Sequence, residues 1–224
     1  MTRDSLLAIV VVVIPAFNEQ KTIGGVVNEV SQYCAQVVVV DDGSQDQTAS
    51  IAENAGAVVL KQSINKGYDQ ALSIGFEYAY ESTGADITVS FDADGQHSGV
   101  DIEKLVSPIL KGEADLVLAQ RKHLTHWSEK VFSLFSSQFG VKDPLCGLKA
   151  YDRSVYSRFG VFDTVGSIGT ELSLKAIKCG FRPAFVGIDT MPRQDQSRFY
   201  RESLRANIKI IKALLRVRSL LKSL

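Results

Sequence analysis

Residues 8–19 read AIVVVVIPAFNE, a run of seven apolar residues that ends in a polar turn. Because no polar residue interrupts the run, it predicts a strand that is buried on both faces, as in a parallel sheet. VVVV at residues 37–40 has the same character and is followed by the polar cluster DDGS. Residues 21–33, between the two runs, place four apolar residues on one helical face, namely Ile23, Val26, Val27 and Val30. Together these segments predict a strand–helix–strand unit of an α/β fold.

The alternation of strand and helix continues along the chain. We expect further strands at residues 57–60, 86–91, 115–119, 147–151 and 183–188. We expect further helices at residues 47–54, 68–80, 100–110, 128–139, 170–179 and 201–221. Such a series predicts a Rossmann-like, mostly parallel sheet that is flanked by helices and has right-handed crossovers. We divide the chain into a domain at residues 1–200 and a C-terminal helix at residues 201–224.

The composition is that of an ordinary globular protein. With 224 residues, of which 45% are hydrophobic and 22% charged, the chain is expected to form one main domain. A disordered chain, a collagen-like fibre and a disulfide scaffold are excluded. The three cysteines are far apart and form no CxxC pair, so we expect reduced thiols in a cytoplasmic protein. No apolar run approaches the roughly 20 residues that a membrane span needs, and the first run lacks a signal-peptide cleavage pattern.

The charges balance overall but are unevenly distributed. The chain has 25 basic and 25 acidic side chains, so its bulk charge predicts no nucleic-acid partner. The segment from residue 193 to the end contains nine basic and two acidic side chains, a net charge of +7. The rest of the chain therefore carries a net charge of −7. A basic tail on an acidic body indicates an anionic surface or ligand as a partner.

The expected C-terminal helix is amphipathic. At about 100° per residue, five basic side chains fall in one narrow arc, namely Arg201, Arg205, Lys209, Lys212 and Arg216. The broad opposite side is mainly apolar, although Arg218 and Lys222 interrupt it. A helix of this kind lies on an anionic bilayer, which predicts a peripheral protein at the cytoplasmic membrane face. The alternatives are a helix packed on the domain with a solvated basic face, and oligomerisation through the apolar side.

Polar clusters follow three of the expected strands. In a parallel sheet the carboxyl ends of the strands meet at one edge, so the clusters after residues 14, 40 and 91 should lie together. Asp92 and Asp94 form an i, i+2 pair whose oxygens suit Mg²⁺ or Mn²⁺, and Gln96 could add a carbonyl oxygen. Both carboxylates are expected to face solvent. The alternative is a solvated acidic turn without a metal ion.

No nucleotide-binding glycine motif follows any expected strand. Both G-x-G-x-x-G and G-x-x-x-x-G-K-[ST] are missing, so a flavin or nicotinamide cofactor is not expected. The phosphates of a ligand would then be held by a metal ion and side chains. His97, beside the acidic pair, is expected to cap the surface or to hydrogen-bond to a metal ligand rather than to bind the metal itself.

Six segments together resemble a known family. They are IPAFNEQKTI (14–23), VVVVDDGSQDQT (37–48), NKGYDQAL (65–72), FDADGQH (91–97), DPLCGLKAYDR (143–153) and ELSLKAIKCGF (171–181). The first four are similar to the motifs of glycosyltransferase family 2, which has the GT-A fold. All six resemble the subgroup of dolichyl-phosphate or polyprenyl-phosphate sugar synthases, over about residues 8–200.

The resemblance implies a nucleotide-diphosphate sugar donor, an inverting transfer, and Mg²⁺ or Mn²⁺ as cofactor. It implies that the donor is bordered by Pro15, Ala16, Phe17, Glu19, Asp41, Asp42, Lys66, Gly67 and Ala93. Asp42 should contact the base while Asp41 supports the turn. The metal ion should be held by Asp92, Asp94 and Gln96. Arg121 should reach a phosphate, which makes Asp94 and Arg121 the expected catalytic residues, and the donor should be covered by Arg193 and Arg198.

The acceptor is expected to be a polyprenyl phosphate. Members of the family that glycosylate a sugar hydroxyl carry an acidic pair where this chain has Ile168 and Gly169. A hydroxyl needs a general base, whereas a phosphate oxygen is already anionic at neutral pH. Glu171 or Asp143 could supply a base from a different geometry, which leaves a sugar hydroxyl as an alternative acceptor. A nucleotide-sugar-binding module without turnover is a second alternative, although the intact D-A-D-x-Q sequence favours an enzyme.

Overall fold

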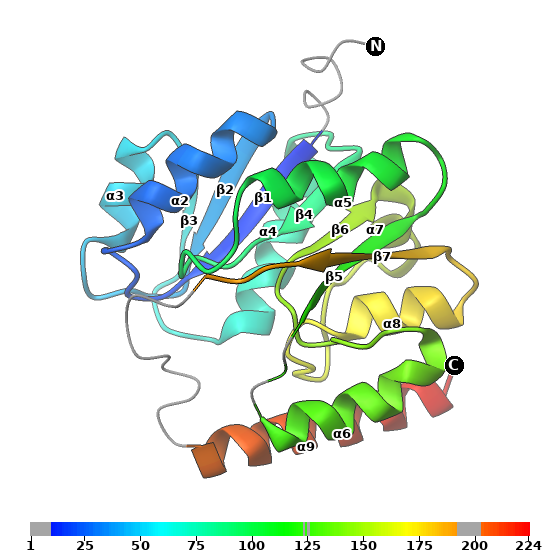
Figure 1. The fold of residues 1–224 in the computed structure, drawn as a ribbon. Coiled ribbons are helices and arrows are strands. Elements are labelled where there is room, and N and C mark those ends of the chain that lie inside the picture. Colours follow the sequence, from blue (N-terminus) through cyan, green and yellow to red (C-terminus); the bar gives the residue numbers. More distant parts are fainter. Residues whose placement is uncertain (1–9, 123, 125, 192–202) are drawn as a thin grey trace.

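The structure, a computed structural model, describes residues 10–122, 124, 126–191 and 203–224. Its described part contains a seven-stranded sheet with the order β3-β2-β1-β4-β6-β5-β7 (Figure 1). The strands are β1 (Val10–Ala16), β2 (Gln36–Asp41), β3 (Val58–Lys61), β4 (Ile87–Ser90), β5 (Leu116–Arg121), β6 (Lys149–Asp152) and β7 (Pro183–Ile188). The helices are α2 (Ile23–Val30), α3 (Thr48–Asn54), α4 (Tyr68–Ser82), α5 (Val100–Leu110), α6 (Trp127–Ser136), α7 (Arg153–Phe159), α8 (Glu171–Lys178) and α9 (Ser203–Lys222).

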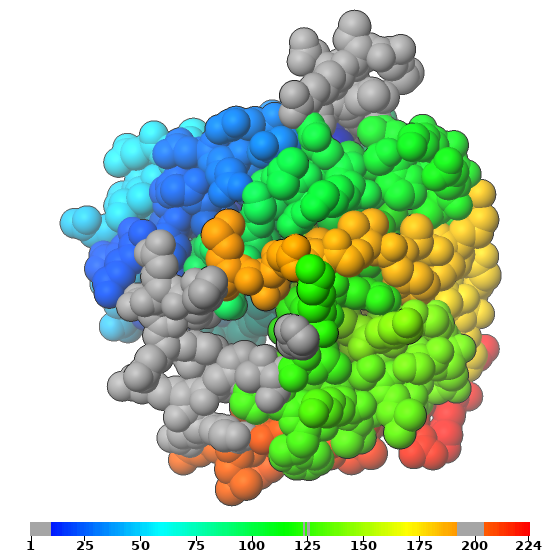
Figure 2. All heavy atoms as spheres, viewed as in Figure 1, coloured from blue at the N-terminus to red at the C-terminus, as the bar shows by residue number. Residues whose placement is uncertain are grey.

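The sheet is mostly parallel, as expected, and β6 is the strand that runs against the others. The pairs β3–β2, β2–β1, β1–β4 and β5–β7 are parallel, whereas β6 is antiparallel to both β4 and β5. β6 therefore separates β4 from β5, which follow each other in the sequence. β7 forms the edge of the sheet, and Figure 2 shows its residues on the surface beside α5.

Two hydrophobic cores cover the two faces of the sheet. Val10, Val12 and Ile14 point into the first core with α2 and α5, whereas Val11 and Val13 point into the second core with α4, α8 and α9. Every residue of β1 is buried. The uninterrupted apolar run in the sequence thus corresponds to a central strand with helices on both faces, as the period-two geometry of a strand requires.

Most element predictions are confirmed, with small differences at the ends. The helices expected at residues 21–33 and 128–139 end in 3₁₀ turns at Ser31–Tyr33 and Ser137–Phe139. α7 was not expected, because seven residues are too few to show a helical period; it begins where the Asp152 side chain accepts a hydrogen bond from Ser154 N. Residues 8 and 9 of the first expected strand and residues 201 and 202 of the last expected helix lie outside the described residues.

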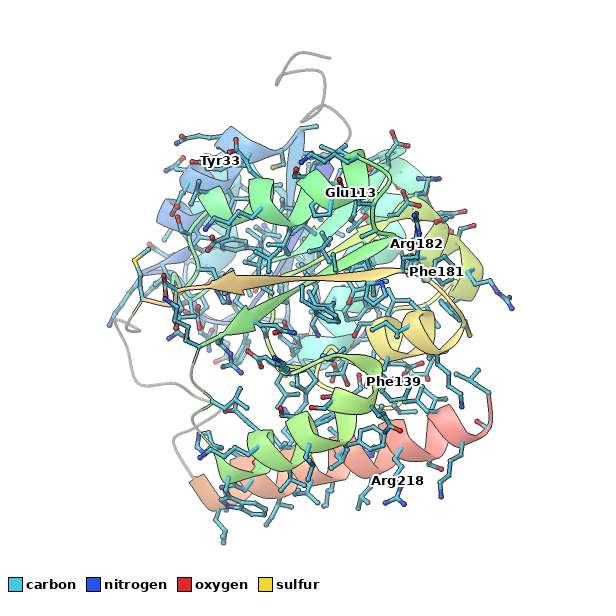
Figure 3. The ribbon with its side chains drawn as sticks, turned by 45° about the vertical axis from the view of Figure 1, so that its right-hand side comes forward. Tyr33, Glu113, Phe139, Phe181, Arg182 and Arg218 are labelled. Atoms are coloured by element: carbon cyan, nitrogen blue, oxygen red, sulfur yellow. The ribbon has the colours of Figure 1, made fainter. Side chains whose placement is uncertain are left out.

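α9 packs against α6 on the second core rather than standing apart from it (Figures 1 and 3). Ile210, Ala213 and Val217 are fully buried, and Ser128 Oγ at the start of α6 donates a hydrogen bond of 2.5 Å to Asn207 Oδ1. The apolar side of α9 is therefore divided: part of it packs on the domain, while Leu204, Ile208 and Leu215 remain exposed. No helix within the described ranges is both long and apolar enough to cross a membrane.

Candidate functional site

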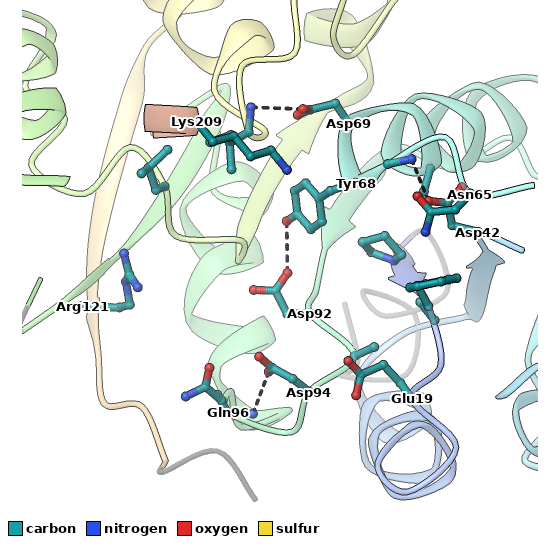
Figure 4. A pocket seen from close by; sticks show the side chains of 18 residues that line it. Glu19, Asp42, Asn65, Tyr68, Asp69, Asp92, Asp94, Gln96, Arg121 and Lys209 are labelled. Carbon is teal, nitrogen blue, oxygen red and sulfur yellow. Dashed lines mark hydrogen bonds between the residues drawn. The ribbon is translucent and has the colours of Figure 1, made fainter. Parts of the chain in front are cut away.

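A pocket of about 460 Å³ opens where the expected strand-end clusters meet (Figure 4). The loops after β1, β2 and β4 border it, together with the start of α4 and one residue of α9. Eleven residues expected at the site line it: Pro15, Ala16, Phe17, Glu19, Asp42, Gly67, Asp92, Ala93, Asp94, Gln96 and Arg121. Arg193 and Arg198 lie outside the described residues.

Side chains of the β2 loop and of the first residue of α3 hold the β1 loop in place. Asn18 N donates to Ser44 Oγ at 2.8 Å, and Glu19 N donates to Thr48 Oγ1 at 2.7 Å. Gly43, in the same turn, has a φ of 76°, and a Cβ there would lie 2.8 Å from the carbonyl carbon of Ile64. Glycine is thus required both by the left-handed conformation and by the close approach of a neighbouring loop.

Asp42 holds the loop before α4 through both carboxylate oxygens. Its Oδ1 accepts from Lys66 N at 2.8 Å and its Oδ2 accepts from Gly67 N at 2.7 Å. Asp41 does not line the pocket, and its Oδ1 accepts from Ser44 N at 3.0 Å. The Lys66 side chain also lies outside the lining and donates to Gln62 Oε1. Asp42 therefore shapes the rim, and its contact with a base stays a prediction.

Asp92 is more constrained than the sequence suggested. We expected a solvent-facing carboxylate, but only 26% of its side chain is exposed. Tyr68 Oη donates to Asp92 Oδ1 at 3.0 Å, and His97 Nε2 lies 3.4 Å from Oδ2. A Cβ at Gly147 would lie 2.1 Å from Oδ2, so the carboxylate packs directly against the backbone of that residue. His97 from the same loop, and Tyr68 and Gly147 from elsewhere in the sequence, thus fix the orientation of Asp92.

His97 is buried beside Asp92 rather than at the surface. It is 5% exposed, and its ring meets that of Phe91 edge-on. Burial would lower the pKa of His97, but the hydrogen bond and charge of Asp92 outweigh burial and raise it. Conversely, burial would raise the pKa of Asp92, and the hydrogen bond and charge of His97 lower it below its usual value. His97 is therefore a hydrogen-bonding neighbour of Asp92, one of the two roles expected for it.

Asp94 and Gln96 line the pocket, and Figure 4 shows them at the same end as Glu19. Gln96 N donates to Asp94 Oδ1 at 3.1 Å, while Gln96 Nε2 donates to the Met191 carbonyl at 3.2 Å. Two aspartates and an amide carbonyl are all-oxygen donors, which is the chemistry that Mg²⁺ and Mn²⁺ favour. Among the described residues no cluster of three or more His, Cys, Asp or Glu side chains could hold a metal ion by itself. The donor set fits a cation that shares its coordination with substrate phosphates and water.

Arg121 enters the pocket with its charge already paired. Its Nε and Nη2 donate to the two oxygens of Asp143 at 2.7 and 2.9 Å, and Nη2 lies 3.4 Å from Glu129 Oε1. Burial would lower the pKa of Arg121, but the hydrogen bond and charge of Asp143 outweigh it and raise the pKa further. A bidentate pair of this kind fixes the guanidinium plane. Asp143 and Glu129 therefore position Arg121 at the pocket.

Neither carboxylate considered as an alternative base points into the pocket. Asp143 is 2% exposed and holds Arg121. Glu171 is 1% exposed and accepts hydrogen bonds from Thr164 N, Val165 N and Lys175 Nζ. Both are therefore occupied by interactions within the protein.

Several lining residues were missed by the sequence analysis: Asn65, Tyr68, Asp69, Ala71, Leu145, Ile168 and Lys209. Tyr68 and Asp69 stand inside the quoted NKGYDQAL segment, but their helical position gave no sign that they face a ligand. Lys209 was assigned to the basic arc of the C-terminal helix. Burial, followed by the charge of Asp163, raises the pKa of Asp69 to about 6. Only the packing of α4 and α9 against the loops brings these residues to the pocket.

Known proteins resemble this chain in sequence. The sequence model of the family described as glycosyl transferase family 2 matches residues 11–126. A UDP-N-acetylglucosamine–dolichyl-phosphate N-acetylglucosaminyltransferase from Methanococcus voltae is 30% identical over 177 residues, which cover 65% of this chain and 70% of that protein. A polyprenol monophosphomannose synthase from Mycolicibacterium smegmatis is 28% identical over 208 residues, 82% of this chain and 77% of that protein. A relative from Methanocaldococcus jannaschii is 41% identical over 113 residues, and this match covers only 45% of the length of that relative.

A solved structure with the same fold is that of glucosyl-3-phosphoglycerate synthase from Mycobacterium tuberculosis in complex with Mn²⁺ and UDP-glucose. Its TM-score is 0.76 at 23% identity, and the match covers 97% of this chain and 83% of that one. At this identity the likeness concerns the fold alone, and it confirms the expected GT-A class with its mostly parallel sheet flanked by helices.

Proposed function

Because this chain belongs to glycosyl transferase family 2, we propose that it transfers a sugar, with inversion, from a nucleotide-diphosphate sugar to a polyprenyl phosphate. The observation that carries the proposal is a pocket that contains the Asp92–Asp94 pair, a positioned arginine and, at one end, apolar side chains beside a lysine. The names of the Methanococcus voltae and Mycolicibacterium smegmatis relatives support this acceptor class.

The donor is proposed to occupy the side of the pocket bordered by the β1 and β2 loops. Pro15, Phe17 and Asp42 line that side, and the hydrogen bonds between the two loops hold it in one shape. A preformed wall lowers the entropy that the protein loses on binding, which strengthens the binding of a ligand that fits it. The UDP-glucose in the solved structure of the same fold supports a nucleotide sugar as donor.

Asp92 and Asp94, with the Gln96 carbonyl, are the residues proposed to hold Mg²⁺ or Mn²⁺. A divalent ion there would neutralise the negative charge that develops on the leaving diphosphate. The chain's own part is orientation, because Tyr68 and His97 fix both oxygens of Asp92. Arg121, held by Asp143, presents a second positive charge to the phosphates, and a charge fixed before the reaction stabilises the transition state without reorganising.

A phosphate acceptor is consistent with the engagement of Asp143 and Glu171 in contacts within the protein. A hydroxyl acceptor requires a base within hydrogen-bond reach, whereas a phosphate oxygen does not. Asp143 and Glu171 are buried and occupied, so neither serves as that base. Asp69 is the observation that favours a sugar hydroxyl as the second candidate acceptor, since it lines the pocket and its pKa is raised to about 6. Its two oxygens, however, already accept from Ile168 N and Gly169 N.

Association with an anionic membrane at its cytoplasmic face completes the proposal. The side-by-side helices α6 and α9 both carry exposed apolar side chains, among them Trp127, Leu134 and Leu204, which are 59%, 78% and 76% exposed. The exposed face of α9 also carries Arg205 and Arg216, and Arg218 lies on its outer side (Figure 3). Apolar side chains flanked by basic ones match the interior and the head groups of an anionic bilayer. Such docking would bring the pocket to a lipid-linked acceptor.

The proposal is tested by a product screen. Purified full-length chain is incubated with UDP- and GDP-sugars, Mg²⁺ or Mn²⁺, and either polyprenyl phosphates or oligosaccharides, and products are identified by mass spectrometry. We expect a sugar phosphoprenol, no product in excess EDTA, and no product from Asp94→Ala, with Glu113→Ala on the distant surface as the active control. Transfer only to a sugar hydroxyl would refute the polyprenyl phosphate as acceptor. Activity in excess EDTA would refute the proposed metal dependence. Binding of a nucleotide sugar without turnover would identify a non-catalytic module.

A further inference from the structure

One end of the pocket is built from three segments that are far apart in the sequence. Leu145 comes from the loop before β6, Ile168 from the loop before α8, and Lys209 from the first half of α9. Figure 4 shows Lys209 and Asp69 at the end of the pocket that is away from Glu19 and Asp94. This end therefore lies opposite the loops that carry the donor-side residues.

A buried lysine and a half-buried aspartate fix the loops of this end. Lys149 is 2% exposed, and its Nζ donates to the carbonyls of Pro144 at 2.9 Å and Gly169 at 2.5 Å. It thereby joins the loop of Leu145 to the loop of Ile168. From the other side, Asp69 accepts from Ile168 N at 3.2 Å and from Gly169 N at 2.6 Å.

Ile168 itself has a backbone conformation that demands such support. Its φ is 58°, in the left-handed region that a β-branched residue rarely adopts. Strain of this kind persists only where the surrounding structure over-determines it, and it is concentrated at ligand sites. The contacts of Asp69 and Lys149 supply that constraint, so this end of the pocket is formed before a ligand binds.

The chemistry of this end is amphipathic. Leu145 and Ile168 offer apolar contact, and Lys209 offers an ammonium group. Arg121 and Lys209 are the cations of the described lining, and Arg121 is already shared between Asp143 and Glu129. Lys209 interacts electrostatically with Asp69, whose oxygens are directed to the backbone of the Ile168 loop. A monophosphate joined to a hydrocarbon chain fits a cation beside two apolar side chains.

Resting on the proposed function, we infer that Lys209 binds the acceptor phosphate and that Leu145 and Ile168 contact the adjoining prenyl chain. A phosphate oxygen forms the bond to the anomeric carbon, while the bond from that carbon to the nucleoside diphosphate breaks and its electron pair leaves with the diphosphate. No proton has to move when the acceptor is a dianion. The ammonium group of Lys209 reduces the repulsion between the two phosphate-bearing substrates, so it contributes to acceptor binding rather than to donor binding.

The test compares Lys209→Met with Lys222→Met, the same substitution on an exposed lysine in the last turn of α9, outside the pocket lining. The acceptor is a short, water-soluble prenyl monophosphate, so that membrane binding plays no part. Loss of a charge-assisted contact should raise the KM for this acceptor roughly 10- to 100-fold. Lys222→Met should stay within about twofold of wild type. The Kd for the nucleotide sugar should not change in Lys209→Met, and Lys209→Arg should recover part of the acceptor affinity.

The other possible results distinguish a failure of the role of Lys209 from a failure of the proposed function. An unchanged acceptor KM in Lys209→Met, with an active wild type, refutes the role of Lys209 and leaves the proposed function intact. An equal rise in the donor Kd assigns Lys209 to the donor instead. A wild type that hydrolyses donor but transfers to no prenyl phosphate refutes the proposed function, and the inference fails with it.

Discussion

Replacing Gly147 by alanine should disable the site while leaving the fold in place. An ideal Cβ at this position would lie 2.1 Å from Asp92 Oδ2, 2.3 Å from Oδ1 and 2.4 Å from Cγ. Ordinary van der Waals contacts of a Cβ begin at 3.4 Å, so the carboxylate would have to retreat by more than 1 Å. The φ of Gly147 is not in the left-handed region, so the backbone accepts alanine and the effect is one of space.

The retreat of Asp92 is costly because the carboxylate is held from two sides. Tyr68 Oη and His97 Nε2 lie 3.0 and 3.4 Å from its oxygens, and both contacts would be stretched or lost. A displacement of about 1 Å at a catalytic group can cost on the order of 100-fold in rate. Overpacking of this kind also destabilises proteins by about 1–3 kcal/mol. We therefore expect a fall of about 100-fold in kcat with a folded protein.

Three measurements on one preparation check this expectation: the initial rate of sugar transfer, Mn²⁺ affinity by electron paramagnetic resonance, and thermal unfolding. Gly187→Ala is the matched control, because a Cβ on that strand residue meets nothing within 4 Å. It should keep the wild-type rate and Mn²⁺ affinity. A Gly147→Ala protein with wild-type rate and Mn²⁺ affinity would show that the position of Asp92 does not matter, and the reasoning would be wrong.

Two further predictions concern Asp69 and α9. Because burial raises the pKa of Asp69 to about 6, the folded protein binds this proton more tightly than the unfolded chain and loses stability as the pH rises from about 4 to 7. Asp69→Asn removes that loss, so the free energy of unfolding of the variant, relative to wild type, should rise by about 2–3 kcal/mol over this pH range. Urea denaturation at several pH values measures this difference. A difference between variant and wild type that does not change with pH would contradict the raised pKa of Asp69. Ile208→Asp with Leu215→Asp should weaken sedimentation with anionic vesicles without lowering Tm, because both side chains are exposed. Val100→Asp on α5 is the control, and unchanged vesicle binding by the α9 variant would refute docking through this helix.

The sequence alone was sufficient for the fold class and for predicting that most of the strand-end residues lie around one pocket. The runs at residues 8–14 and 37–40 identify central strands, because only a strand covered on both faces tolerates uninterrupted valine and isoleucine. Once those strands are parallel, the residues that follow them must meet at one edge, which is why Asp42, Asp92 and Asp94 could be grouped before the structure was known. These conclusions depend on the hydrophobic pattern of single strands and on the right-handedness of strand–helix–strand connections, and both can be inferred from short segments of sequence.

Only the tertiary structure determined how the individual side chains are used. Asp92 looked solvent-facing, because no local pattern shows that Tyr68, His97 and Gly147 close around it. The insertion of β6 between β4 and β5 was equally hidden, since the pairing of β6 with β4, which is not its neighbour in the sequence, leaves no periodic signal.

The end of the pocket that contains Leu145, Ile168 and Lys209 is the clearest case of a feature that the sequence does not reveal. α9 has basic residues on one arc and apolar residues on two others, and helical periodicity cannot tell which apolar residues pack inward. Burial of Ile210, Ala213 and Val217 against the domain sets the rotation of the helix, and that rotation directs Lys209 to the pocket. Long-range packing thus decides which of several similar lysines faces the ligand, because the rotation of a helix depends on its partners and not on its own sequence alone.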